Sequence, residues 1–198
     1  MALRHAVLAA LLGNELSGYQ LAKLFDVNIS NYWHALPQQL YTELAKLESA
    51  GLVAGREVAQ RGRPNKRVYT LTEAGTAEMS AFIAGPSKPS AIRDDLLVKM
   101  QGAEAGDSAR LIAQLEERAD EARGKIEQFE RRLIQARGDL DEETFLTQSP
   151  WVGPYLVGLR GISFEREALD WCNRSAEVLR ARRKHPVTPS TAQASKDR

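Results

Sequence analysis

Side chains that can hydrogen-bond to another molecule are gathered in one short segment of the chain. The stretch "LPQQLYTELAKLESAGLV", Leu36 to Val53, places two glutamines, a tyrosine, a threonine and a lysine between its leucines. A glutamine amide can bond an adenine edge at two points, and a threonine can reach a base edge or a thymine methyl. Tyrosine and lysine are suited to phosphate oxygens. The segment therefore predicts contacts with DNA through Gln38, Gln39, Tyr41, Thr42 and Lys46.

A cluster of cations follows this segment. Residues 56–67 hold five basic side chains against one acid, although the formal net charge of the whole chain is only +1. A local cluster of cations on a near-neutral chain is the pattern expected where one loop meets an anion. The basic cluster consists of Arg56, Arg61, Arg63, Lys66 and Arg67, and the last four of these are predicted to contact DNA.

Periodicity and turn residues predict the elements that would position both groups. Leu40, Leu44 and Leu47 fall at i, i+4 and i+7, which indicates a helix over 37–50 with its leucines buried. Pro37 suits the first turn of this helix, and Gly51 suits its end. The runs "LVAGREVA" and "KRVYTLT" predict two strands joined by the turn "QRGRPN".

Helices are also predicted before and after these elements. Leucine and valine spacing indicates a first helix in residues 3–12, while Ser17 and Thr72 are expected to cap the second and fourth helices. Three helices, a hairpin and a further helix make a winged helix-turn-helix, whose third helix enters the major groove and whose hairpin is the wing. This domain is predicted to cover residues 1–85. The stretch "AGPSKPSA" predicts a linker over 86–91.

The second half of the chain, residues 92–184, is predicted to be helical and coiled-coil-like, with a disordered polar tail over 185–198. From Ile112 to Leu133 apolar residues alternate steps of three and four, which is a heptad seam. Such a helix needs another helix, and the spacing does not choose between the last helix of the same chain and a second chain. The predicted dimerisation residues are Ile112, Leu115, Ala119, Ala122, Ile126, Phe129 and Leu133 of the seam, with Leu159, Ile162 and Leu169 further on.

The whole arrangement resembles a known family, the PadR-type transcriptional regulators. The motifs that carry the resemblance read "LYTELAKLESAGLV" (Leu40 to Val53) and "YTLTEAG" (Tyr69 to Gly75). In the second half, "AIRDDLLVKM" and "YLVGLRGISFEREALDWC" are similar to the branch that contains the virulence-gene activators. The resemblance, over residues 1–184, implies a homodimer held by the C-terminal helices that reads a palindromic operator. It also implies contact of Tyr41 with the DNA backbone, and repression rather than activation.

Two departures from the family pattern limit what can be transferred. The predicted groove helix opens with Pro37, Gln38 and Gln39 where relatives often carry small hydroxyl residues, so the base preference does not carry over. The wing has its own sequence, "AQRGRPNKR".

Catalytic and metal-binding patterns are not found. The chain has no Gly-rich phosphate loop, no HExxH motif and a single cysteine, Cys172, so the sequence predicts neither an enzyme nor a cofactor nor a metal site. No apolar run approaches the roughly 20 residues that span a bilayer, and a cytosolic location is expected. The aromatic residues Trp151, Tyr155, Phe164 and Trp171 are interpreted either as dimer core or as a pocket for a small aromatic or hydrophobic effector.

Two plainer alternatives accompany the prediction of DNA binding. The polar helix face and the basic loop could be solvated surface only, but helix, hairpin and basic turn occur in the order that a winged helix requires. A rival function from another class is a protein–protein adaptor that uses the winged helix and the heptad helix as docking surfaces. An adaptor would show no sequence-dependent binding to a duplex, whereas a DNA-binding protein would bind with an affinity that falls steeply with salt.

Overall fold

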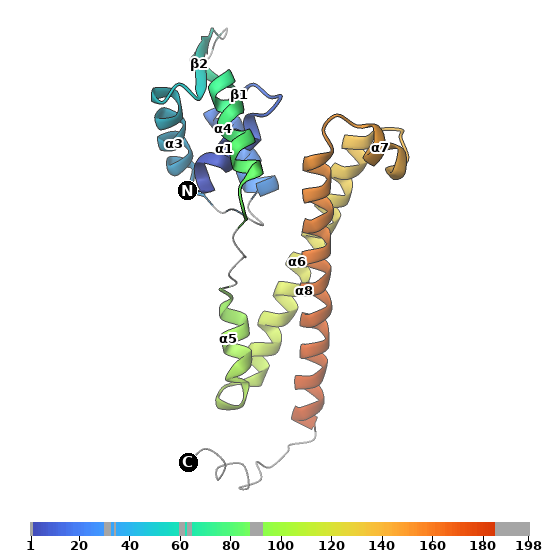
Figure 1. Ribbon diagram of the computed structural model, residues 1–198. Helices are drawn as coiled ribbons and strands as arrows, with labels where there is room; N and C mark the ends of the chain where they lie inside the picture. Colours follow the sequence, from blue (N-terminus) through green and yellow to red (C-terminus); the bar gives the residue numbers. More distant parts are fainter. Residues whose placement is uncertain are drawn as a thin grey trace. The chain divides into compact units, whose positions relative to one another are not determined.

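The chain folds into two compact units, Met1–Ser90 and Ala91–Arg198, which are described separately (Figure 1). The computed structural model describes residues 2–29, 33, 35–59, 62, 65–87 and 93–184. The division between the units falls within the predicted linker; its residues 88–91 and the predicted tail lie outside the described residues. None of the described helices combines the length and apolar composition needed to cross a membrane.

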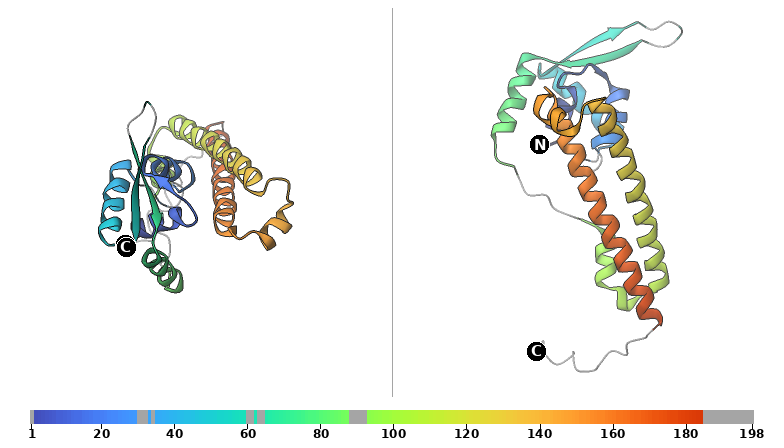
Figure 2. Two further views of the ribbon diagram at one scale, coloured as in Figure 1. Left: turned by 90° about the horizontal axis from the view of Figure 1, so that it is seen from above. Right: turned by 90° about the vertical axis from the view of Figure 1, so that its right-hand side faces the viewer.

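The N-terminal unit contains short helices around a small sheet. Its elements are α1 (Ala2–Leu11), β1 (Leu16–Ser17), α2 (Gly18–Leu24), the π-helix η1 (Phe25–Ile29), α3 (Pro37–Ser49), β2 (Val53–Val58), β3 (Lys66–Leu71) and α4 (Glu73–Ala84). The sheet is antiparallel with the order β1-β3-β2, and β2 and β3 form a hairpin that extends beyond the helices (Figure 2). The predicted helices and hairpin are present. The sequence did not predict β1 or η1, because two extended residues and one wide helical turn leave no periodic signal.

The helix α3 is fixed by the residues that predicted it. Leu40, Leu44 and Leu47 are each about 1% exposed and pack into the core of the unit with α1 and α2. Burying a leucine stabilises a fold by about 2 kcal/mol, so the leucine stripe determines which face of α3 points outward. Pro37 occupies the first position of the helix, and Gly51 follows its end with a φ of 70°, which a residue with a side chain rarely adopts.

Caps and one close contact fix the neighbouring elements. The Ser17 hydroxyl accepts a hydrogen bond from the Gln20 N–H at the start of α2, and the Thr72 hydroxyl accepts one from the Gly75 N–H at the start of α4, as predicted. Thr72 also donates to the Gly51 carbonyl at 2.7 Å. A Cβ at Gly75 would lie 2.0 Å from the Leu52 carbonyl oxygen, so only glycine allows α4 to approach this backbone. These contacts join the hairpin and α4 to the end of α3.

The C-terminal unit is a long helical hairpin. Its elements are α5 (Asp95–Gln101), the 3-10 turn η2 (Ala103–Ala105), α6 (Ser108–Arg137), α7 (Glu142–Gln148) and α8 (Val152–Lys184). The helices α6 and α8, of 30 and 33 residues, run side by side, α7 lies in the turn between them, and α5 packs against α6 (Figures 1 and 2). A mainly helical chain with an N-terminal winged helix-turn-helix, as predicted, is confirmed.

The predicted heptad seam is occupied by α8 of the same chain. Ile112, Leu115 and Ala119 are buried with Cys172 and Ala176 of α8, and Leu169 packs against this cluster. The seam positions toward the other end, Ile126, Phe129 and Leu133, are buried or partly buried in a second cluster with Phe145 of α7. From α8 this cluster includes Leu159 and Ile162. Ala122 is fully buried. Of the two partners that the spacing left open, the intrachain one is therefore present in the structure of the single chain.

Candidate nucleic-acid interface

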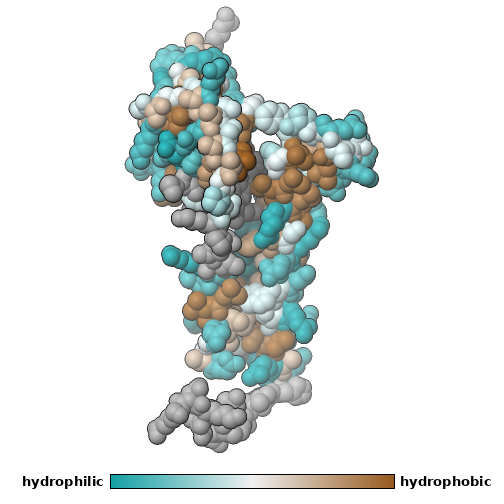
Figure 3. All heavy atoms as spheres, viewed as in Figure 1, coloured by the Kyte–Doolittle hydropathy of each residue, from teal (hydrophilic) through white to brown (hydrophobic). Residues whose placement is uncertain are grey.

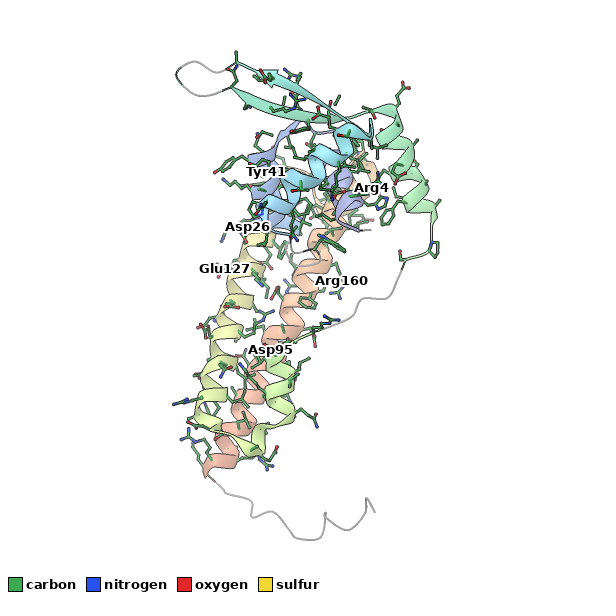
Figure 4. All side chains as sticks on the ribbon, turned by 90° about the vertical axis from the view of Figure 1, so that its left-hand side faces the viewer. Arg4, Asp26, Tyr41, Asp95, Glu127 and Arg160 are labelled. Carbon is green, nitrogen blue, oxygen red and sulfur yellow. The ribbon has the colours of Figure 1, made fainter. Side chains whose placement is uncertain are left out.

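One face of α3 presents the side chains that the sequence singled out. Gln38, Gln39, Thr42 and Lys46 are exposed, and about half of Tyr41 is exposed at the surface of the unit (Figure 4). The leucines of the same helix lie on the opposite side, in the core. Because the buried leucines fix the orientation of α3, its polar side chains face outward and are available to another molecule.

The hydrogen bonds within α3 distinguish these residues from one another. The Gln39 side-chain oxygen accepts from the Leu36 N–H at 2.9 Å, so this glutamine satisfies a free N–H at the start of the helix, while its NH₂ group stays available for another partner. The Thr42 hydroxyl donates to the Gln38 carbonyl at 2.9 Å, which leaves its methyl and its oxygen lone pairs available. The exposed Gln38 amide makes no hydrogen bond within the described part of the chain, so both its oxygen and its NH₂ group are free for another partner.

Tyr41 is held against the helix that precedes it in the helix-turn-helix. A Cβ placed on Gly18, the first residue of α2, would lie 2.2 Å from the Tyr41 Cε1 and 2.8 Å from its Cδ1. The ring therefore rests on the backbone of α2, and only glycine at this position leaves room for it. This contact restricts the tyrosine at the place where α2 and α3 meet.

Small side chains continue the exposed face toward the end of α3. Thr42, Ala45, Lys46, Ser49 and Ala50 line a shallow, open depression. Alanine and serine project little from a helix, so another surface can approach the helix closely along this line.

The wing cations do not form one uniform group. Arg67 of β3 donates to the Glu48 Oε1 at 2.6 Å, and Arg56 of β2 bonds Glu15 with its Nε at 2.7 Å and its Nη2 at 2.6 Å. Lys66 is partly buried. Arg61 and Arg63 lie outside the described residues. Gly62 has a φ of 71°, as suits the tip of a hairpin.

Glu48 is the centre of the α3–wing contact. Its Oε1 also accepts from the Gly55 N–H of β2 at 3.0 Å. The hydrogen bond from Arg67 is the main cause that lowers the pKa of the Glu48 carboxyl from its ordinary value, with the charge of Arg67 and the Gly55 N–H adding to it. The carboxylate is therefore ionised at neutral pH. Sequence reasoning missed Glu48, because an acid on a helix face looks the same whether or not a strand brings an arginine to it.

A second missed residue is Tyr19, in the first turn of α2. Its side chain is 71% exposed, next in sequence to the glycine that supports Tyr41. A large exposed aromatic with a polar tip is suited to an interface. The available signal was an aromatic residue two positions after the Ser17 cap.

The four aromatic residues interpreted as a pocket do not come together within one chain. Tyr155 is buried beside Phe145, with ring centroids 4.8 Å apart, and its hydroxyl donates to Glu142. Trp171 packs with the other cluster, at the opposite end of the hairpin. It follows Tyr155 by sixteen residues, which places it about 24 Å further along the helix. Trp151 and Phe164 are exposed.

The described residues give little support for a metal site or a nucleophilic cysteine. No group of three or more histidine, cysteine, aspartate or glutamate side chains among them could hold a metal ion. Cys172 is buried in the α6–α8 contact, and burial raises the pKa of its thiol. A thiol of this kind is a poor nucleophile.

Comparisons with known proteins agree with this geometry. Residues 7–81 match the model of the transcriptional regulator PadR-like family, and residues 92–180 match the virulence activator alpha C-term model. The probable transcriptional regulator Rv1176c of Mycobacterium tuberculosis is 36% identical over 197 residues, which cover 92% of this chain and all of the relative.

Solved structures of two proteins illustrate the shared fold. Bacillus subtilis PadR in complex with operator DNA superposes with a TM-score of 0.72 at 22% identity, over 90% of this chain and 99% of that one. The same protein was also solved with p-coumaric acid. The Vibrio cholerae virulence activator AphA gives a TM-score of 0.63 at 23% identity, over 90% of this chain and 98% of that one.

The fold is a winged helix with a helical C-terminal unit, and the family match and the 36% identical relative make the chain a transcriptional regulator. The chain belongs to the PadR-like family, in the branch whose C-terminal region is that of the virulence activators. The family and the relatives named here are regulators of transcription and not enzymes.

Proposed function

We propose that this protein is a homodimeric repressor that binds a palindromic DNA operator with α3 in the major groove. The observation that carries the proposal is the exposure of Gln38, Gln39, Tyr41, Thr42 and Lys46 on one side of a helix whose leucines are buried. It is supported by the fold shared with a PadR solved on operator DNA. Because its target is DNA, we expect the protein in the cytoplasm.

The side chains divide into two kinds of contact. Gln38 and Thr42 are assigned to base edges, Gln38 because its amide is free to bond at two points and Thr42 because its methyl and oxygen face outward. Tyr41 and Lys46 are assigned to phosphates, which supply affinity but no sequence information. Gln39 joins them through its NH₂ group only.

Dimerisation is assigned to the outer surface of the C-terminal unit and not to the buried seam. Figure 3 shows apolar surface over α5 and over the α7 end of this unit. Large apolar side chains are exposed along α5, α6 and α8; these are Leu97, Val98, Ile134, Leu156, Val157, Phe164 and Val178. Extended apolar surface of this kind is typical of a protein–protein interface. A twofold dimer would bring two α3 helices about 34 Å apart, one turn of DNA.

Repression and an effector follow from relatives. A 27% identical Bacillus subtilis protein is named a negative transcriptional regulator, which supports repression. The complex of a PadR with p-coumaric acid supports an effector that is small and aromatic. Because Trp151 and Phe164 are exposed, with Arg160 lying over the Phe164 ring at 5.6 Å, we assign such a site to the surface that a second chain would cover.

The test is binding to a pool of random-sequence duplexes, followed by measurement of stoichiometry and salt dependence on the enriched sequence. We expect an inverted repeat that binds two chains, with log K falling linearly as log salt rises. Absence of any enriched sequence, at a salt concentration where the protein is dimeric, would favour the adaptor alternative.

A further inference from the structure

Two arginines of the basic cluster are engaged within their own domain. Arg67 is bonded to Glu48 at 2.6 Å, and Arg56 holds both carboxylate oxygens of Glu15. Their ion pairs connect residues 19 and 41 positions apart in the chain, so they are tertiary contacts and not local ones.

The two pairs lie on opposite faces of the wing. In the register of the hairpin Arg56 is opposite Val68, and Glu57 is opposite Arg67. Residues directly opposite share a face, and successive residues of a strand alternate between faces. Arg56 therefore projects from the face that Val68 shares, and Arg67 projects from the other.

The acids come from the two elements that flank the hairpin. Glu48 is in the last turn of α3, and Glu15 directly precedes β1, the strand that leads into α2. One pair thus connects the wing to the proposed groove-binding helix, and the other connects it to the start of the helix-turn-helix.

The Glu48 pair is closely fitted to the strand beneath it. A Cβ at Gly55 would lie 2.4 Å from the Glu48 Oε1 and 2.6 Å from the Arg67 Nε. The carboxylate and the guanidinium therefore fill the space above Gly55, whose N–H binds the same oxygen. The Arg67 guanidinium also lies over the Tyr69 ring, 5.9 Å from its centroid. A phosphate that reached the Nη2 of Arg67 would have to displace Glu48 from it.

We infer that Arg56 and Arg67 are positioning residues that fix the angle of the wing relative to α3, rather than phosphate contacts. The inference rests on the proposed binding to DNA, and it reassigns Arg67, which the sequence placed among the DNA contacts. The carboxylates of Glu15 and Glu48 offset part of their positive charge, so they add less to the attraction of DNA than unpaired arginines would. They act by holding the remaining surface of the wing in register with the groove.

The sign of one substitution separates the two roles. Glu48→Gln removes the charge of the partner but keeps its shape and its ability to accept from Gly55. If Arg67 were a restrained phosphate contact, this change would release it and strengthen binding to every duplex. If Arg67 positions the wing, the affinity for the enriched operator falls, by about threefold or more.

Glu57→Gln is the matched control, because Glu57 is an exposed acid opposite Arg67 on the same hairpin but, in the part of the chain that is described, forms no ion pair with it. It measures the gain that comes from removing any negative charge near DNA. We expect Glu57→Gln to bind the operator as tightly as the wild type or more tightly, and Glu48→Gln to bind it less tightly. Both variants should melt within a few degrees of the wild type, since exposed ion pairs add little stability.

A double-mutant cycle with Arg67→Gln gives an independent reading. If the two residues act only through their ion pair, the first substitution already removes it. The double variant should then bind the operator no less tightly than the single variant of lower affinity. Additive effects of opposite sign, with Glu48→Gln strengthening and Arg67→Gln weakening, would overturn the inference.

Amide hydrogen exchange of the protein without DNA keeps the inference separate from the proposed function. We expect faster exchange in β2 and β3 of Glu48→Gln than of Glu57→Gln. Exchange that is unchanged in Glu48→Gln would show that the pair does not hold the wing. Hydrogen exchange needs no duplex. Failure of the wild type to bind DNA would therefore count against the proposed function and not against the positioning role of Arg56 and Arg67.

Discussion

The two units differ in the large apolar side chains that they expose. Among the described residues, large apolar or aromatic side chains are exposed in the N-terminal unit at Tyr19, Leu36, Tyr41, Phe82 and Ile83, and two of these five carry a polar tip. In the C-terminal unit the same class is exposed at Leu97, Val98, Ile134, Leu140, Trp151, Leu156, Val157, Phe164 and Val178. Tyr19 and Tyr41 give the first surface polar groups for a polar partner, whereas the larger apolar set of the second suits an apolar one. The two surfaces therefore fit the two proposed partners, DNA for the first and a second copy of the chain for the other.

Their interiors differ as well. The buried residues described in the N-terminal unit are apolar apart from Ser17. In the C-terminal unit Glu165 of α8 is 1% exposed and accepts from Arg118 at 2.9 Å and from Lys125 at 3.3 Å, both of α6. A long apolar seam allows neighbouring registers of two helices, whereas a buried charge with fixed partners disfavours all but one. We therefore expect the ion triad to specify the register of the hairpin.

The largest expected effect comes from placing charge on the apolar surface of the C-terminal unit. Leu156→Asp with Val157→Asp should dissociate the dimer, because two carboxylates would have to be buried at the interface. Loss of bivalent binding should then weaken operator affinity about 100-fold. Sedimentation equilibrium measures the dimer, and titration of the duplex measures the affinity.

Ile83→Asp is the control for that substitution. It charges a similarly exposed apolar position, but in the N-terminal unit. We expect it to leave the dimer intact. Dissociation by Ile83→Asp, or an intact dimer in the Leu156/Val157 variant, would contradict the division of partners between the units.

Glu165→Ala should lower the free energy of unfolding by about 2–3 kcal/mol, measured by denaturant titration. Removal of one partner from a buried ion pair leaves the other charges uncompensated. This loss is smaller than is usual for breaking a fully buried ion pair, because the Arg118 and Lys125 side chains are 24% and 44% exposed and can be solvated by water. The matched control is Glu130→Ala, which breaks an exposed pair with Arg166 and should change stability by less than about 1 kcal/mol. Equal losses in both variants would remove the special role of Glu165.

Gly18→Ala should weaken binding to all duplexes by about fivefold, the equivalent of one hydrogen bond. A methyl at this position would collide with the Tyr41 ring and displace it. In a Tyr41→Ala background the same substitution should have almost no further effect. A full additional loss in that background, read by fluorescence anisotropy, would mean that Gly18 does not act through Tyr41.

Lys46→Ala should have the smallest effect, a uniform weakening that reduces the slope of log K against log salt by about one. Lys184→Ala, in the C-terminal unit, controls for the loss of one positive charge. A slope that is unchanged by Lys46→Ala would exclude this lysine as a phosphate contact.

Much of the N-terminal unit could be predicted from local signals, because single residues determine its element ends. Pro37, Gly51, Ser17 and Thr72 each have one physical role at the place where they stand. The leucine stripe of α3 then determined the exposed face. What the sequence could not provide were pairings between distant residues. Glu48 and Arg67 look like ordinary solvated charges until a strand brings them together.

Prediction was weaker for the C-terminal unit, and the reason is the nature of its pattern. A heptad seam has the same spacing whether its partner is in the same chain or in another, so the contact with α8 could not be derived. The proposed aromatic pocket met a different obstacle. Tyr155 and Trp171 lie in different clusters because a long stretch of α8 separates them. The rise per residue of a helix gives this separation, but only once the segment is known to be one continuous helix.

The most direct test of the central claim, that the exposed face of α3 reads bases, is parallel selection from a random duplex pool with the wild type and with Gln38→Ala. We predict that both proteins enrich an inverted repeat and that Gln38→Ala loses its preference at one base pair of each half-site, by about 1–3 kcal/mol. Enrichment of the same sequence with the same preferences by both proteins would contradict the account, as would no enrichment by the wild type.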